Sequence, residues 1–187
     1  MPDEALIDAL GASQRLGMLG DRAVVEVIEH AGAFVDALGA TSGTVVDLGS
    51  GGGVPGLVIA RSRPDLHIVL VDRRAARTDH LRRLVGRLGV EHHVEVLTAE
   101  AAALPALLAD QVDAVVARGF GPPAETLRLA APLLAVRGLA VVSEPPRPVR
   151  GRWPEELLGA VGVALVAHDD TRVACFRRLD VSRGTRA

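Results

Sequence analysis

Short apolar runs alternate with amphipathic segments over most of the chain. The runs are rich in Val, Ile and Leu and are too short for long helices, which favours buried strands. Between them, apolar residues at three- and four-residue spacing predict helices. This alternation is typical of a parallel sheet covered by helices. The predicted strands are residues 44–48, 67–72, 94–98, 112–117 and 139–143, and the predicted helices are residues 54–61, 74–88, 101–109 and 123–134.

The N-terminal region carries a helical pattern of its own. Asp21 is placed to cap a helix whose apolar positions run from Val24 to Leu38, and Gly39 follows as its end. We therefore treat residues 1–40 as an N-terminal helical segment that precedes the alternating pattern.

The C-terminal region changes the pattern again. A short helix is predicted at residues 157–160, followed by strands at residues 161–167 and 172–179. Only HDDT separates these two strands, so they are expected to pair as an antiparallel hairpin. The sequence thus predicts an α/β fold with a seven-stranded, mostly parallel sheet over residues 41–187, in a single globular unit with the N-terminal segment.

A glycine-rich loop, DLGSGGGVPG at residues 47–56, follows the first predicted strand. Gly51, Gly53 and Gly56 have the spacing G-x-G-x-x-G between a strand and a helix. Missing side chains let a ligand lie against the main chain, and the following helix offers unpaired N–H groups. A flexible loop without a ligand is the alternative, but ordering so many glycines costs entropy, which favours a binding loop.

Two acidic residues border this loop. Asp47 stands two residues before the first glycine, Gly49, and Asp72 closes the second predicted strand, where a carboxylate can accept both hydroxyls of a ribose. Sites for NAD and for S-adenosylmethionine (SAM) share an acid at this second position. Asp47 favours SAM, because a carboxylate there repels a diphosphate but not an ammonium group. The alternatives are local: Asp47 caps loop N–H groups, and Asp72 is a solvated strand end or a helix cap.

Composition narrows the chemistry further. All 21 basic residues are arginines, so a lysine nucleophile and a P-loop lysine are excluded. Cys175 is the single cysteine, which excludes an internal disulfide and a cysteine-based metal cluster. His92 and His93 are adjacent and would point to opposite faces of a strand, so we expect no metal site. With a net charge of -2 and few aromatic residues, any RNA contact would depend on arginine.

Arginines gather in two places that could contact phosphates. One group, Arg73 to Arg87, lies on the helix after Asp72, and the other, Arg147, Arg150 and Arg152, lies in the Pro-rich stretch SEPPRPVRGRWPEE. We expect a cytoplasmic protein without membrane association, because residues 1–20 lack the pattern of a secretory signal and no apolar run approaches the thickness of a bilayer.

Together these motifs resemble a known family. DLGSGGGVPGLVIA at residues 47–60, IVLVD ending at Asp72, and ARGFGPP at residues 117–123 are similar to motifs of the RsmG (GidB) family, the 16S rRNA guanine-N7 methyltransferases. The resemblance implies a Rossmann-like class I SAM-dependent methyltransferase fold for residues 41–187. It also implies SAM as the cofactor, and 16S rRNA or the small ribosomal subunit as the partner.

The resemblance further implies roles for individual residues. The glycine loop would hold the methionine part of SAM, Asp72 the ribose, and the residues after the third strand the adenine. Arg118 would be the catalytic residue, facing both the methyl donor and the incoming base; the alternative for its side chain is an ion pair with a nearby acid at the strand end. The cofactor-binding residues expected in this way are Asp47, Gly49, Ser50, Gly51, Gly53, Asp72, Arg73, Ala99, Glu100 and Arg118.

The chain departs from the family where RNA or substrate contacts are expected. It lacks the Asn-Leu-Thr segment that the family carries near its N-terminus, Thr98 replaces an arginine, and Ser143-Glu144 replaces a lysine. It therefore resembles a shortened, divergent member. Two other functions stay open: methylation of a small molecule, and SAM binding without catalysis. Asp47 and the closing hairpin disfavour an NAD-binding protein.

Overall fold

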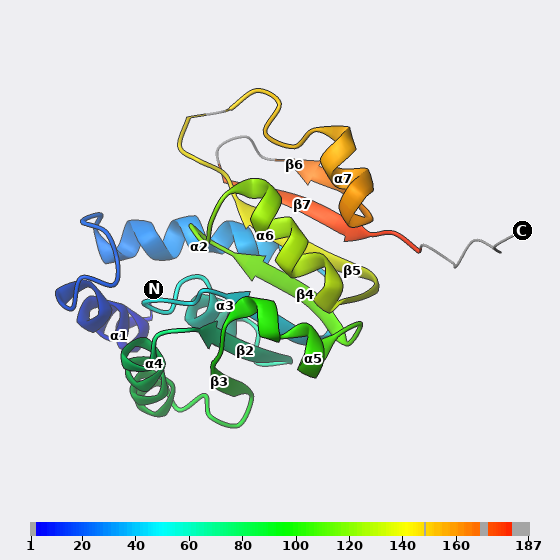
Figure 1. The fold of residues 1–187 in the computed structure, drawn as a ribbon. Helices are drawn as coiled ribbons and strands as arrows, with labels where there is room; N and C mark the ends of the chain where they lie inside the picture. The colour runs from blue at the N-terminus through cyan, green and yellow to red at the C-terminus, as the bar shows by residue number, and fades with distance from the viewer. Residues whose placement is uncertain (1–2, 148, 169–171, 181–187) are drawn as a thin grey trace, which may run out of the picture.

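Seven strands form one mixed sheet in the computed structural model, which describes residues 3–147, 149–168 and 172–180. The strand order is β3-β2-β1-β4-β5-β7-β6 (Figure 1). The pairs among β1 to β5 are parallel, whereas β7 pairs antiparallel with both β5 and β6. The strands are β1 Gly43–Leu48, β2 Leu66–Asp72, β3 Val94–Thr98, β4 Val112–Ala117, β5 Leu134–Ser143, β6 Val163–His168 and β7 Val173–Arg178.

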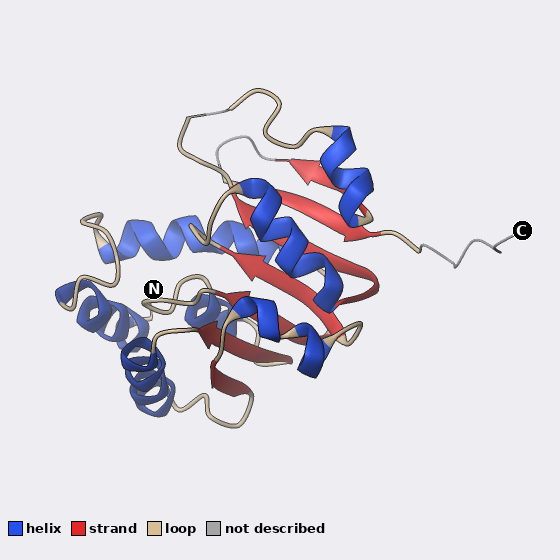
Figure 2. Cartoon of the chain, in the orientation of Figure 1, coloured by secondary structure: helices blue, strands red, loops and turns tan. Residues whose placement is uncertain are grey.

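Helices cover both faces of this sheet (Figures 1 and 2). One apolar core joins α1 to α4 with one face, and a second core joins α6 and α7 with the other. Alternate residues of a strand divide between the two cores, as Val45 and Val46 of β1 do. The helices are α1 Glu4–Arg15, α2 Val24–Leu38, α3 Gly56–Ser62, α4 Ala75–Leu88, α5 Pro105–Leu108, α6 Pro123–Ala130 and α7 Glu155–Val161, with 3-10 turns η1 Ala101–Ala103 and η2 Ala131–Leu133.

The predicted α/β architecture, its parallel sheet and its closing hairpin are confirmed. Strands β3 and β4 have the predicted bounds, but β5 begins at Leu134 rather than at residue 139. Arg137 has a positive φ of 67° and Gly138 follows it, so this part of the strand resembles a turn in sequence. The pairing register between β4 and β5 shifts over the same residues.

Three helix predictions need correction. The helix predicted at residues 101–109 is divided into η1 and α5, because Pro105 lacks the N–H that a continuous helix requires. The helix predicted at residues 123–134 ends as α6 at Ala130 and continues only as η2. Asp21 does not cap α2, whose N-cap residue is Ala23 without a side-chain hydrogen bond.

The N-terminal helices share the core of the sheet. Leu10 of α1 and Phe34 of α2 are fully buried in the same cluster as Leu57 and Leu81. A buried hydrogen bond of 2.9 Å joins Ser13 Oγ of α1 to His80 Nε2 of α4. Among the described residues, no helix combines the length and the apolar content that a membrane crossing requires.

The topology directs attention to one edge of the sheet. The strand order reverses direction between β1 and β4, so the connections after these two strands run to opposite sides. In open parallel sheets, ligands bind outside the carboxyl ends of the strands at such a switch point. The glycine loop and Asp72 both lie at this edge, since each follows or ends a parallel strand.

Candidate functional site

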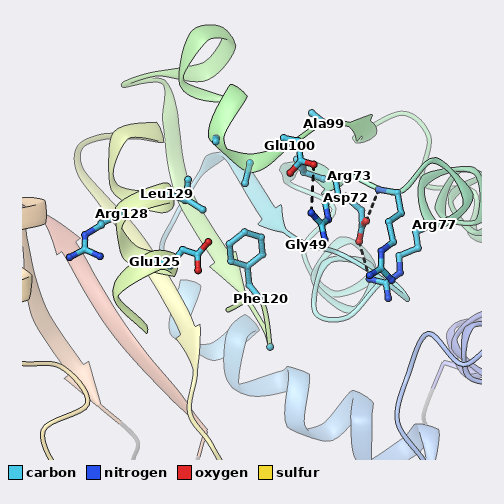
Figure 3. A pocket seen from close by; sticks show the side chains of 15 residues that line it. Gly49, Asp72, Arg73, Arg77, Ala99, Glu100, Phe120, Glu125, Arg128 and Leu129 are labelled. Atoms are coloured by element: carbon cyan, nitrogen blue, oxygen red, sulfur yellow. Dashed lines mark hydrogen bonds and ion pairs between the residues drawn. The ribbon is translucent and has the colours of Figure 1, made fainter. Parts of the chain in front are cut away.

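A cavity of about 630 Å³ opens at the carboxyl ends of the parallel strands (Figure 3). It is lined by five of the ten residues expected to bind the cofactor: Gly49, Asp72, Arg73, Ala99 and Glu100. The other five lie behind the lining, in the glycine loop and its supports; these are Asp47, Ser50, Gly51, Gly53 and Arg118.

Asp72 connects the cavity to the glycine loop. Its Oδ2 accepts a hydrogen bond of 3.1 Å from Gly51 N and lies 3.4 Å from Arg77 Nη1, while its Oδ1 accepts one of 2.9 Å from Arg74 N. The residue is only 5% exposed. An ionised carboxylate offers about four lone-pair positions, so these three donors leave one position, and release of Arg77 would open a second.

Ser50 and Gly53 shape the loop from within. Ser50 Oγ accepts a hydrogen bond of 3.0 Å from Val71 N and donates one of 2.9 Å to the carbonyl of Asp47, so this hydroxyl joins β1 to β2. Gly53 N donates to Ser50 O over 2.7 Å and closes the turn. The side chain of Ser50 therefore supports the turn rather than facing the cavity.

Asp47 lies beneath the loop at 1% exposure. Its Oδ2 accepts a hydrogen bond of 3.0 Å from Gly56 N, and a Cβ atom at position 56 would lie 2.5 Å from the same oxygen. Glycine at 56 is thus needed for the close approach of this carboxylate. Oδ1 has no hydrogen-bond partner in the described part of the chain, and burial raises the pKa of Asp47 to about 7.

Arg118 supports the opposite side of the loop. Its Nε donates a hydrogen bond of 3.2 Å to Val54 O, and no hydrogen bond joins its Nη groups to another described residue. Burial lowers the pKa of Arg118, while the nearby Asp47 carboxylate acts in the opposite direction. Arg118 is thus close enough to Asp47 for the two charges to interact.

The mouth of the cavity is crossed by an ion pair. Arg73 Nη1 lies 3.7 Å from Glu100 Oε1, and both side chains are largely exposed (Figure 3). Ala99 N donates a hydrogen bond of 3.2 Å to Asp72 O, which keeps the residues after β3 next to the end of β2. The expected adenine and ribose residues therefore lie side by side.

Several lining residues were not predicted as site residues. Arg77 lies on the first turn of α4. Its position five residues after Asp72 was the sequence feature that could have indicated a place in the site. Glu125, Arg128 and Leu129 come from α6, whose contact with the cavity no local pattern indicates. Phe120 packs against the core and also lines the cavity. A Cβ at Gly49 would lie 2.6 Å from its ring.

Thr98 and Glu144, which stand where the family carries other residues, both make polar contacts with neighbouring side chains. Thr98 Oγ1 lies 2.6 Å from Thr78 Oγ1 and accepts a hydrogen bond of 3.2 Å from Arg82, which also donates to the carbonyl of Val96 over 3.2 Å. Here a guanidinium from α4 lies beside the position where the family carries its arginine.

Glu144, the second replacement, is buried and accepts a hydrogen bond from Trp153 Nε1. Its Oε2 lies 3.1 Å from Arg152 Nε. Arg152 is therefore held by the fold, which removes it from the group of loop arginines expected to contact phosphates, whereas Arg147 and Arg150 are exposed.

The histidine pair differs from expectation. His92 and His93 lie in a turn before β3, and His92 Nε2 is 2.9 Å from His93 Nδ1, so the two rings do not point to opposite faces. The expectation assumed a strand that begins only at Val94. In the described part of the chain, no group of three or more His, Cys, Asp or Glu side chains is placed to hold a metal ion.

Comparisons with solved structures show the fold. The [4+2]-cyclase SpnF superposes with a TM-score of 0.71 at 16% identity, covering 94% of this chain and 93% of its own. Geranyl diphosphate C-methyltransferase from Streptomyces coelicolor A3(2), solved in complex with S-adenosyl-L-homocysteine, gives a TM-score of 0.67 at 16% identity, covering 85% and 78%. The sheet topology is that of the class I SAM-dependent methyltransferases.

Comparisons of sequence are more specific. Ribosomal RNA small subunit methyltransferase G from Nocardioides sp. is 40% identical over 153 residues, which are 70% of this chain and 60% of the relative. The protein of the same name from Methylobacillus flagellatus is 30% identical, over 65% of this chain and 55% of its own. The chain thus spans little more than half the length of these relatives. The family model for rRNA small subunit methyltransferase G (GidB) matches residues 10–145, and the chain belongs to this family.

Proposed function

We propose that this protein is a cytoplasmic SAM-dependent methyltransferase that transfers a methyl group to guanine N7 of 16S rRNA. The observation that carries the proposal is the placement of two buried carboxylates on either side of a glycine loop next to a cavity, with Asp72 in the cavity lining and Asp47 behind it. Family membership supports the rRNA acceptor. The cytoplasmic location follows from ribosomal RNA as the proposed substrate.

The residues present fit SAM better than a dinucleotide. Asp72 has lone pairs left for ribose hydroxyls, and Glu100 and Ala99 lie beside it for the adenine. Asp47 lies behind the cavity lining and its Oδ1 lacks a partner among the described residues, so its negative charge is left to attract an ammonium group of a ligand across the loop. A diphosphate near the same carboxylate would be repelled.

The attack of guanine N7 on the methyl group requires no proton transfer by the protein. SAM supplies an electrophilic methyl group on a sulfonium, and guanine N7 carries a lone pair without a proton. The protein therefore acts by holding the donor and the base in line, and proximity of this kind can supply roughly 7–11 kcal/mol. We assign donor positioning to Asp72 and the loop backbone, and acceptor positioning to the Nη groups of Arg118, which can donate to guanine O6 and leave N7 free.

A small-molecule acceptor is the second candidate. It is favoured by Glu144, which lies where the family carries a lysine and is engaged by Trp153 and Arg152 at the substrate edge. Such an acceptor would need fewer basic contacts than a ribosomal subunit.

Methyl transfer to small ribosomal subunits from a strain that lacks the modification tests the function. With labelled SAM, we expect label in 16S rRNA, recovered as 7-methylguanosine after digestion. Label that appears only with small-molecule acceptors would select the second candidate. Calorimetry that shows SAM binding without transfer to any acceptor would indicate a binding protein, and preferential NAD binding would contradict the proposal altogether.

Replacement of Asp72 by alanine should weaken SAM binding about 10- to 100-fold, because hydrogen bonds from ribose hydroxyls to a charged carboxylate are lost. Arg77→Ala is the matched control, since it removes the cation at 3.4 Å and leaves the carboxylate for the ligand. Calorimetry with SAM measures both affinities, and fluorescence of the single tryptophan, Trp153, follows unfolding in urea. Equal losses in the two variants would assign the effect to the ion pair.

Replacement of Arg118 by alanine should reduce the rate of methyl transfer about 100-fold, as expected for loss of a donor that orients the reacting group. The SAM affinity should fall less, because Nε supports the loop only through Val54 O. The rate of methyl transfer is measured in single turnovers at saturating SAM, and the SAM affinity by calorimetry, for the wild type and for Arg118→Ala. Equal losses in rate and in SAM affinity would mean that Arg118 supports cofactor binding and does not position the acceptor.

The affinity for SAM should rise with pH up to about pH 7. Burial raises the pKa of Asp47 to about 7, so at lower pH this carboxyl is neutral and no longer attracts the ammonium group of the ligand across the loop. Below that pKa the affinity is expected to fall by up to about tenfold per pH unit. Asp47→Asn should bind more weakly and with a flat profile in calorimetry from pH 5 to pH 8, whereas parallel profiles in the two proteins would contradict the assignment.

The pH dependence of the stability of the wild type and of Asp47→Asn tests whether the pKa of Asp47 is raised in the folded protein. The folded-state pKa of Asp47 lies above its ordinary value of 3.8, so between these values the folded protein binds more protons than the unfolded chain. The free energy of unfolding should therefore decrease as pH rises through this window, by at most about 1.4 kcal/mol per pH unit, and Asp47→Asn should lack this contribution.

A further inference from the structure

The connection between α1 and α2, residues 16–23, contacts the glycine loop from outside the cavity. A Cβ atom at position 52 would lie 2.8 Å from Leu19 Cδ2 and 3.0 Å from the carbonyl oxygen of Met18. Both distances are shorter than ordinary van der Waals contact. Leu19 thus occupies the space that a side chain at position 52 would need.

Leu19 is unusual within its own segment. Its side chain is 8% exposed, whereas Leu16 in the same connection is 58% exposed and Gly20 and Asp21 are also exposed. Leu19 does not line the cavity, to which the loop contributes Gly49, so a ligand there would not contact this side chain. Its burial comes from contact with the protein core and with Gly52.

Polar contacts fix the connection in place. Gln14 Nε2 donates hydrogen bonds of 2.7 Å to the carbonyls of Gly20 and Arg22, and Met18 N donates to Ser13 O over 3.0 Å. Ser13 in turn bonds His80 of α4 within the core. The segment that carries Leu19 is therefore attached to the helix that follows Asp72.

The glycine loop is consequently held from two sides. Asp72 accepts a hydrogen bond from Gly51 N on the side of β2, and Leu19 packs on Gly52 on the side of α1. Glycine main chain has more conformational freedom to lose than any other residue. A contact that fixes it before a ligand arrives lowers the entropy that ligand binding must overcome.

We propose that Leu19 is a positioning residue of the cofactor site, which holds the main chain around Gly52 in the conformation that binds the methionine part of SAM. The inference rests on the proposed function, because it takes SAM as the ligand. It assigns to the N-terminal segment an indirect part in cofactor binding, through the glycine loop, because no described residue of that segment lines the cavity.

The experiment compares Leu19→Ala with Leu16→Ala, a matched truncation at an exposed site of the same connection. Calorimetry is run with SAM and with 5′-methylthioadenosine, which lacks the amino-acid end. Leu19→Ala should bind SAM about tenfold more weakly, the effect of leaving about one residue of main chain unfixed. Its affinity for 5′-methylthioadenosine should stay within about twofold of the wild type, and Leu16→Ala should match the wild type with both ligands.

A second substitution tests the contact itself. Gly52→Ala places a methyl group where Leu19 lies, so it should displace the loop and weaken SAM binding. The double variant Leu19→Ala/Gly52→Ala should bind SAM more tightly than Gly52→Ala alone, because the shortened side chain at position 19 makes room. Independent sites would instead give losses that add.

The outcomes separate this inference from the function on which it rests. A wild-type protein that fails to bind SAM would contradict the proposed function. Wild-type binding of SAM together with unchanged SAM affinity in Leu19→Ala, or with equal losses for both ligands, would overturn the role of Leu19. Trp153 fluorescence monitors folding, and Leu19→Val, which shortens the side chain by one carbon, replaces Leu19→Ala in the same comparison if the alanine variant unfolds.

Discussion

The main chain of residues 49–56 keeps its conformation because side chains from separate elements occupy the space around it. Phe120 lies over Gly49, Leu19 lies against Gly52, and the Asp47 carboxylate approaches Gly56. Hydrogen bonds from Gly51 to Asp72 and from Arg118 to Val54 complete the support. The glycines at 49, 52 and 56 therefore serve the packing of the protein itself, and the ligand meets a loop that is already ordered.

This support depends on the topology of the sheet. Asp47, Asp72 and Arg118 stand at or just beyond the carboxyl ends of β1, β2 and β4, which are neighbours in the order of strands. Residues far apart in sequence thereby meet at one edge, with the two carboxylates on opposite sides of the loop. Burial then sets the chemistry of Asp47, whose pKa rises because no counter-charge fully compensates its desolvation.

Local patterns predicted the strands and the loop because both depend on residues that are neighbours in sequence. They failed at β5, where Arg137 and Gly138 interrupt an otherwise apolar run, and at Pro105, which divides a helix. The first helix was not separately predicted, although Leu6, Ala9, Leu10 and Ser13 have helical spacing, because two of these buried residues are small and one is polar.

The site was predictable to a similar extent. Asp47 and the glycines stand in one motif, Asp72 ends the next predicted strand, and the family resemblance added Ala99 and Glu100. The contacts of Leu19 with Gly52 and of Phe120 with Gly49 join residues from different elements. Their partners are set by tertiary packing, which a single sequence does not display as a periodic pattern.

The Arg82 guanidinium has a consequence for the open side of the sheet. β3 is an outermost strand. The main chain of His93 and of Ala99 bonds to β2, so by alternation the peptide groups of Val94, Val96 and Thr98 face away from β2. Val96 therefore directs its carbonyl outward, where Arg82 donates to it. An uncovered strand edge invites association with a foreign chain. Arg82, which adds positive charge to α4, thus also occupies a carbonyl at the edge of β3 and disfavours pairing of this edge with another chain.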